Sequence, residues 1–169
     1  MGLVTGRRLS ALCLIATLAP FAAPTSRAQA PIDVYELADY RLTSEVFDRF
    51  VQASGRIGEI TTDDPAFGDA PLVTKDAALS GDAVAEVATL VTRLENHPGL
   101  ANALAAAKIT PREYGKFTIA LIAARLAYGF LQAGVLPRVP SGAPTINVEF
   151  VKTHEPEVVA ALALLGVRD

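Results

Sequence analysis

Apolar side chains recur at helical spacing through most of the chain, and no stretch alternates apolar and polar residues for long enough to form a sheet. A first helix is predicted over residues 43–54, with an apolar face that comprises Val46, Phe47, Phe50 and Val51. A second helix is predicted over residues 82–96, with an apolar face that comprises Val84, Val87, Ala88, Val91 and Leu94. A shorter alanine-rich helix is expected over residues 100–108.

The strongest local signal is the sequence Thr110-Pro111-Arg112-Glu113. A threonine N-cap with a glutamate three residues later forms a capping box, and proline favours the first helical position. The helix that begins here is predicted to span residues 111–133 and to end at Gly134. Its interior, residues 119–131, is apolar nearly all round, which is typical of the buried central helix of a globular domain.

The N-terminal half of the chain contains weaker signals. Residues 33–40 favour a short turn of helix, because Asp33 is a suitable N-cap. Gly55 and Gly58 weaken the end of the helix over 43–54, although Ile57 and Ile60 could continue its apolar face. Residues 61–81 combine proline, glycine and aspartate in a polar setting, which predicts a long connection.

Near the C-terminus, Asn147 is a candidate N-cap for a short helix over residues 148–153. A final helix is predicted from Pro156 to Gly166, with acidic residues near its positive N-terminal end. Together, these patterns predict an all-α fold, a single small domain of four to six helices around the central helix at 111–133.

The first residues of the chain have the layout of a secretory signal peptide. Arg7-Arg8 precedes an apolar run over residues 9–23, and the small residues of Ala28-Gln29-Ala30 follow. The run is shorter than the about 20 residues that a transmembrane helix needs. We expect cleavage after Ala28; cleavage after Ala30 is the alternative, although it leaves a proline first. Retention of the segment as an anchor is left open.

Residues 1–28 are therefore predicted to be removed, and residues 29–169 to form the mature domain. The removal takes away three of the 15 basic residues and none of the 18 acidic ones, which leaves a formal charge of −6. An acidic chain is a poor match for phosphate backbones, so no nucleic acid partner is expected. The sole cysteine, Cys13, lies in the signal segment, so the mature domain is predicted to have no disulfide and no thiolate metal site.

Few residues suggest chemistry. His97 lies at a predicted helix stop, where it could bond the last carbonyls, and His154 lies before another helix; neither has the spacing of a zinc site. Asp63, Asp64 and Asp69 are possible calcium ligands, but their spacing is not that of an EF-hand, and we expect a solvated connection. No catalytic residue, cofactor site or metal ligand is predicted.

Arg125 stands out because it interrupts the apolar central helix. Thr118, Arg125 and Gln132 are spaced by seven residues and form a narrow polar line. One interpretation is an arginine that lines a pocket for an anionic or amphipathic ligand. The favoured interpretation is structural, with a guanidinium that reaches the surface or pairs with an acid.

Three short segments carry a resemblance, and they are Leu42-Thr43, the run Ile109-Thr110-Pro111-Arg112-Glu113-Tyr114, and the run Asn147-Val148-Glu149-Phe150-Val151. In these the chain resembles a loose group of small exported bacterial helical proteins of unknown function. The resemblance implies a helical architecture, and it transfers no functional residues.

The sequence therefore predicts a non-catalytic protein that is exported to the periplasm or the extracellular space. Its expected role is that of an interaction or accessory subunit in the cell envelope, with a protein partner of unknown identity and no transmembrane segment after signal cleavage. An alternative hypothesis is a binder or carrier of an apolar or amphipathic small molecule between the helices. An enzyme is the least favoured class.

Overall fold

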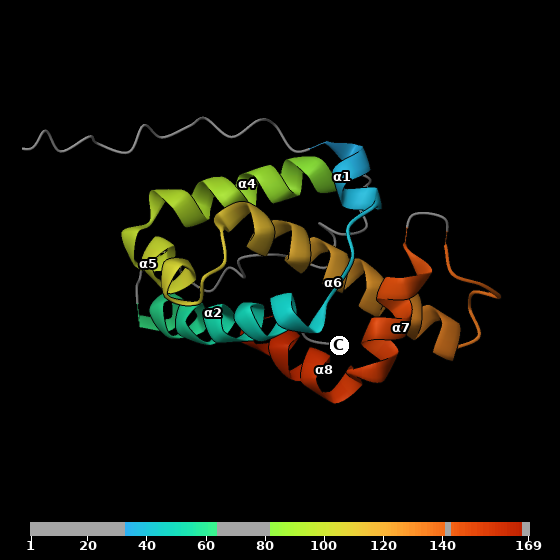
Figure 1. Ribbon diagram of the computed structural model, residues 1–169. Coiled ribbons are helices and arrows are strands. Elements are labelled where there is room, and N and C mark those ends of the chain that lie inside the picture. The colour runs from blue at the N-terminus through green and yellow to red at the C-terminus, as the bar shows by residue number, and fades with distance from the viewer. Residues whose placement is uncertain (1–32, 64–81, 141–142, 167–169) are drawn as a thin grey trace, which may run out of the picture. The chain divides into compact units, whose positions relative to one another are not determined.

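The computed structural model describes residues 33–63, 82–140 and 143–166, and these segments contain seven helices and no strand (Figure 1). The helices are α1 (Val34–Ala38), α2 (Ser44–Asp63), α4 (Ala83–Asn96), α5 (Pro98–Ala106), α6 (Pro111–Gln132), α7 (Thr145–Thr153) and α8 (Glu155–Leu164). The predicted all-α class is confirmed for this part of the chain. The described helices exceed the four to six expected, because the short segments at α1 and α7 form helices of their own. The predicted signal peptide, its cleavage sites, and Asp64 and Asp69 lie outside the described residues.

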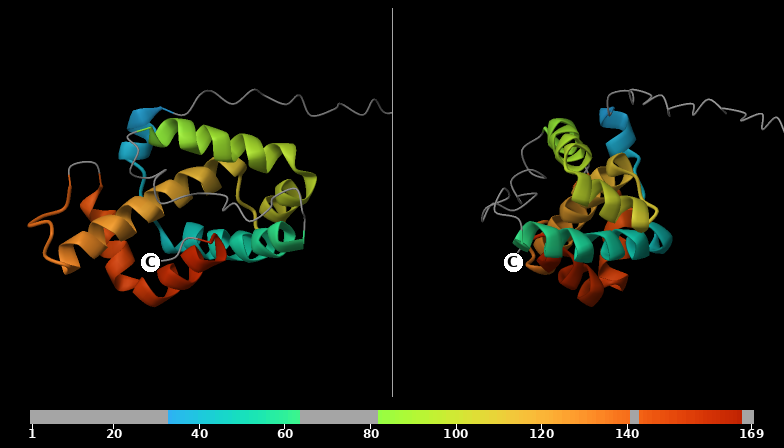
Figure 2. Two further views of the ribbon diagram at one scale, coloured as in Figure 1. Left: turned by 180° about the vertical axis from the view of Figure 1, so that it is seen from behind. Right: turned by 90° about the vertical axis from the view of Figure 1, so that its left-hand side faces the viewer.

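The predicted central helix is observed as α6, which packs against α4, α7, α2 and α5. Figures 1 and 2 show α6 between α4 on one side and α2 on the other, with α8 beyond α2. Ten of its residues are buried, as its apolar circumference predicted. At its start, the Thr110 hydroxyl accepts a hydrogen bond from the backbone N–H of Glu113 at 3.1 Å, as a capping box requires.

The predicted stop of α6 at Gly134 is also observed. Gly134 has a φ of +69°, in the left-handed region that glycine adopts at little cost. Its N–H donates to the carbonyl of Leu131, and the N–H of Val135 donates to the carbonyl of Phe130. This pair of bonds is the Schellman motif, which satisfies the last carbonyls of the helix.

Helix α2 is longer than predicted, since it ends at Asp63 and not near Ser54. The side chain of Ile57 is 1% exposed, and Ile60 packs against the core. Burial of an isoleucine contributes about 1.5–3 kcal/mol, more than the cost of about 1 kcal/mol for a glycine in a helix interior. Tertiary packing therefore overrides the two glycines.

One further expectation about a helix end was wrong. Asn147 is not an N-cap, because α7 begins at Thr145 directly after Pro144 and includes Asn147 in its first turns. His97 lies at the junction of α4 and α5; its Nδ1 accepts a hydrogen bond from the N–H of Leu100 at 3.3 Å, so it is the N-cap of α5. Proline at the first position of α5 has no N–H to satisfy, which favours a helix start there.

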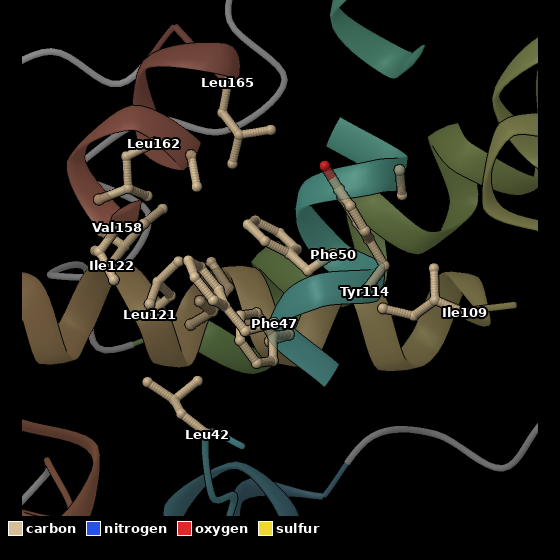
Figure 3. Packing of buried hydrophobic residues seen from close by; sticks show 14 of the residues in the cluster. Leu42, Phe47, Phe50, Ile109, Tyr114, Leu121, Ile122, Val158, Leu162 and Leu165 are labelled. Carbon is tan, nitrogen blue, oxygen red and sulfur yellow. The ribbon is translucent and has the colours of Figure 1, made fainter. Parts of the chain in front are cut away.

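One part of the core lies where α2, α6 and α8 meet (Figure 3), and buried residues of α4, α5 and α7 belong to the same apolar cluster. Phe47 and Phe50 of α2 stack on Phe117 of α6, with ring centroids 6.1 and 4.9 Å apart. From α8, Val158 and Leu162 point toward the same cluster. On the opposite side of α6, α4 approaches closely at Gly115, where an added Cβ would lie 3.0 Å from a methyl group of Val87.

None of the helices in the described segments is long and apolar enough to cross a membrane.

Candidate functional site

The two histidines occupy separate helix junctions. His97 joins α4 to α5 as an N-cap, and His154 joins α7 to α8, where its ring lies 4.6 Å from the ring of Phe150. Asp63 is the last residue of α2. Within the described ranges, no group of three or more His, Cys, Asp or Glu residues could hold a metal ion.

Arg125 is half-buried on α6, and its Nη1 lies close to Gly129, where an added Cβ would approach it to 3.3 Å. Thr118, Arg125 and Gln132 all lie on α6, as predicted, but Thr118 and Gln132 each form a hydrogen bond with another residue of α6. The Thr118 hydroxyl donates to the carbonyl of Tyr114 at 2.8 Å, and the Gln132 amide donates to the hydroxyl of Tyr128 at 2.9 Å. The choice between a structural and a ligand-facing Arg125 stays a prediction.

The densest polar cluster of the described residues was not predicted, and it joins the segment before α2 to the start of α6. The carboxylate of Glu36 accepts hydrogen bonds from the guanidinium of Arg112, through Nε at 3.3 Å and through Nη2. The Nζ of Lys116 donates to Glu36 Oε1 at 2.9 Å, the same oxygen that accepts from Arg112 Nε. These two donors, Arg112 first, lower the pKa of Glu36 from its ordinary 4.5 to about 2.

Tyr40 lies beside this cluster. Its hydroxyl donates to Glu113 at 2.6 Å, and its ring meets the ring of Phe117 edge-on at a centroid distance of 6.4 Å. The Nζ of Lys116 lies 5.1 Å from the centre of the Tyr40 ring, which is a cation–π distance. Burial, and then the hydrogen bond to Glu113, raise the pKa of the Tyr40 phenol well above its usual value.

Asn147 binds the backbone of the same segment from α7. Its Nδ2 donates to the carbonyl of Tyr40 at 2.8 Å, and its Oδ1 accepts from the N–H of Leu42 at 2.9 Å. Asn147 is 1% exposed, so both bonds are shielded from water. A buried amide needs such partners, because an unsatisfied one costs about 1–3 kcal/mol.

We call residues 33–42 the strap and the four residues Arg112, Glu113, Lys116 and Asn147 the seat. Figure 1 shows the strap running from α1 past α6 to the start of α2. The seat offers two cations, one carboxylate and one amide, and all of them bond to the strap. This set of groups is suited to holding a chain segment in place.

The sequence offered one signal for the seat, which is the pair of basic residues Arg112 and Lys116, four positions apart and therefore on one face at the start of the helix. It offered none for Asn147, whose partners lie 105 and 107 positions away.

A second unpredicted polar contact is buried between α2 and α6. The hydroxyls of Ser54 and Tyr114 lie 2.9 Å apart, and the two residues are 0% and 1% exposed. Burial raises the pKa of the Tyr114 phenol, so the group stays neutral. The hydrogen bond between the two hydroxyls fixes α2 against α6. Because both residues are buried, a substrate cannot reach them.

Several large apolar side chains remain exposed at the end of α6 and beyond it. Val135 is 65% exposed and Phe130 40% exposed, and a backbone hydrogen bond joins the two residues within the Schellman motif. Ile146, in the first turn of α7, is 51% exposed. We call Phe130 and Val135 the apolar tip.

In comparisons with known proteins, no family model, no curated protein and no solved structure matches this chain.

Proposed function

We propose that the protein is a non-catalytic, exported interaction or accessory subunit of the cell envelope. The observation that supports this role best is the apolar tip. Phe130 and Val135 are both exposed and are joined by a backbone hydrogen bond, although side chains of the same kind are buried elsewhere in the domain. Adjacent large apolar side chains that stay in contact with water are typical of surfaces that bind a protein partner.

The polar clusters support the same class. The carboxylates of Glu36 and Glu113 are bonded to groups of the same chain, and the Tyr114 phenol is bonded in the core. Each of these groups has a structural partner that accounts for it. The proposed role therefore rests on surface contact rather than on a reaction.

A photo-crosslinking amino acid at position 135, introduced in the native host, tests the proposal. Val135 is exposed, so the replacement should leave the fold intact. We expect a discrete crosslinked product with an envelope protein. The matched control carries the same amino acid at Asp48, an exposed polar position of α2, and should give no such product. Equal products from both positions, or none from position 135, would contradict the proposal, and a crosslinked lipid would favour the small-molecule binder instead.

Export is tested separately by mass spectrometry of the protein from its native host. We expect the mature chain to begin at Gln29, with Pro31 as the alternative start. Recovery of a chain that retains Met1 in the membrane fraction would show that the N-terminal segment is kept as an anchor.

A further inference from the structure

The seat holds the strap through its backbone as well as its side chains; the first half of the strap is helix α1, and residues 40–42 lie outside any helix. Asn147 bonds to a carbonyl and an N–H two residues apart on the strap, at Tyr40 and Leu42. An amide side chain that binds backbone groups in this way fixes the position of a segment whatever its side chains are.

Side chains of the strap then supply the remaining contacts. Glu36 is bound by Arg112 and Lys116, and six positions later the side chain of Leu42 is 5% exposed and points into the core beside Phe47 (Figure 3). A carboxylate and an apolar anchor at this spacing therefore define what the seat accepts.

The strap also depends on contacts with the rest of the domain for its structure. Its helix, α1, has only five residues, too few to be stable without tertiary contacts. The side chains of Glu36 and Arg112 remain 32% and 21% exposed, so water competes for their ion pair. Thr43, which joins the strap to α2, is exposed. A segment with one short helix and partly exposed ion pairs opens at lower free energy than the core, and the burial of Leu42 adds to the free energy that this opening costs.

We propose that the seat is a binding surface for an acidic peptide segment that begins with a short helical turn, and that the strap is its built-in occupant, which leaves the seat as a unit while the helical core stays folded. A competing segment of this chemistry carries a carboxylate six residues before a leucine-like side chain. The inference does not depend on the proposed function, because the seat lies on the first turns of α6 and on α7, whereas the apolar tip lies where α6 ends.

Hydrogen exchange of the purified protein tests the opening directly, with the amide of Leu42 as the reporter. That N–H is held by the side chain of Asn147, so it exchanges when the strap leaves the seat. The amide of Leu121, in the buried middle of α6, reports global unfolding. We expect exchange of Leu42 to accelerate with urea measurably but less steeply than exchange of Leu121, because release of the strap exposes less surface than global unfolding. The same urea dependence for both amides would overturn the proposal.

Glu36→Gln tests the contribution of the carboxylate. Loss of its charge-assisted bonds should speed exchange of Leu42 by about three- to tenfold at neutral pH, within the range for partly exposed ion pairs. The matched control is Glu149→Gln, which removes an exposed ion pair with Lys152 that includes no residue of the strap or the seat, and it should change this rate by less than about twofold. Equal effects of the two substitutions would refute a specific role for Glu36.

The binding surface is tested by adding an acetylated peptide of residues 33–42 to the Glu36→Gln protein, because the peptide then carries a carboxylate that the tethered strap lacks. We expect saturable shifts of the Asn147 side-chain amide signals in NMR spectra and faster exchange of Leu42. A peptide with Glu36→Lys and Leu42→Ala should cause neither effect. Failure of the native peptide to act, or equal action of the altered one, would overturn the proposal.

Discussion

The hydrogen bond between Ser54 and Tyr114 allows a quantitative test of how α2 is fixed against α6. Both hydroxyls are buried, so removal of either one leaves the other without this partner. Tyr114→Phe keeps the ring that packs 5.0 Å from the ring of Phe50 and removes only the oxygen. We expect Tyr114→Phe and Ser54→Ala each to lower the free energy of unfolding by about 1–3 kcal/mol, the cost of a stranded buried polar group.

The double variant distinguishes this explanation from a loss of packing. When both hydroxyls are absent, no polar group is stranded, and the total cost should fall to about 0–1.5 kcal/mol. The double variant is then more stable than the sum of the two single effects, about 2–6 kcal/mol, predicts.

Urea unfolding followed by far-ultraviolet circular dichroism measures these differences, since the chain has no tryptophan to serve as a fluorescent probe. Tyr35→Phe is the matched control, because Tyr35 is 76% exposed and loss of its hydroxyl should change stability by less than about 0.5 kcal/mol. Additive effects of the two core substitutions would refute the coupling, and so would a cost for Tyr35→Phe as large as that for Tyr114→Phe.

Three further predictions follow from burial, close approach and charge. Leu121→Ala should cost about 2–5 kcal/mol of unfolding free energy, whereas Asp48→Ala, at an exposed position, should change it by less than about 0.5 kcal/mol; similar urea midpoints would show that the core is assigned wrongly. Gly55→Ala should raise the thermal midpoint, because no atom lies within 4 Å of the added methyl group, whereas Gly115→Ala should lower it, because Val87 lies 3.0 Å away. The low pKa of Glu36 means that its ion pairs contribute fully above about pH 4.5 and are lost as the pH falls toward about 2. Urea midpoints measured across this range should therefore fall less in Glu36→Gln than in the unaltered protein.

Local chemistry accounts for what the sequence predicted correctly. The start of α6 depends on Thr110 and Glu113, three residues apart, and its end depends on Gly134 and the residues next to it. Helix caps and glycine turns depend on a few neighbouring residues, so they can be predicted from the sequence without knowledge of the fold.

The errors share a different cause, which is contact between residues far apart in the chain. Asn147 has the composition of an N-cap, yet its amide is used by the backbone of Tyr40 and Leu42, more than one hundred positions earlier. In α2, burial of Ile57 outweighs glycines that would end an isolated helix. Single-sequence patterns contain no term for such partners, so the seat could not be predicted, and only the apolar residues Ile57 and Ile60 indicated that α2 continues past its glycines.

The way in which the strap is attached follows from the residues that this chain lacks. With a single cysteine in the whole sequence, no intramolecular disulfide can fix the strap to the core. The attachment consists instead of the ion pairs of Glu36, the hydrogen bond of Tyr40 to Glu113 and the two backbone bonds of Asn147. Each of these bonds is exchangeable, because a competing segment can offer the same carboxylate and the same backbone groups. A disulfide would have fixed the strap to the core permanently, whereas this set of bonds leaves its release to pH, salt and competing peptides.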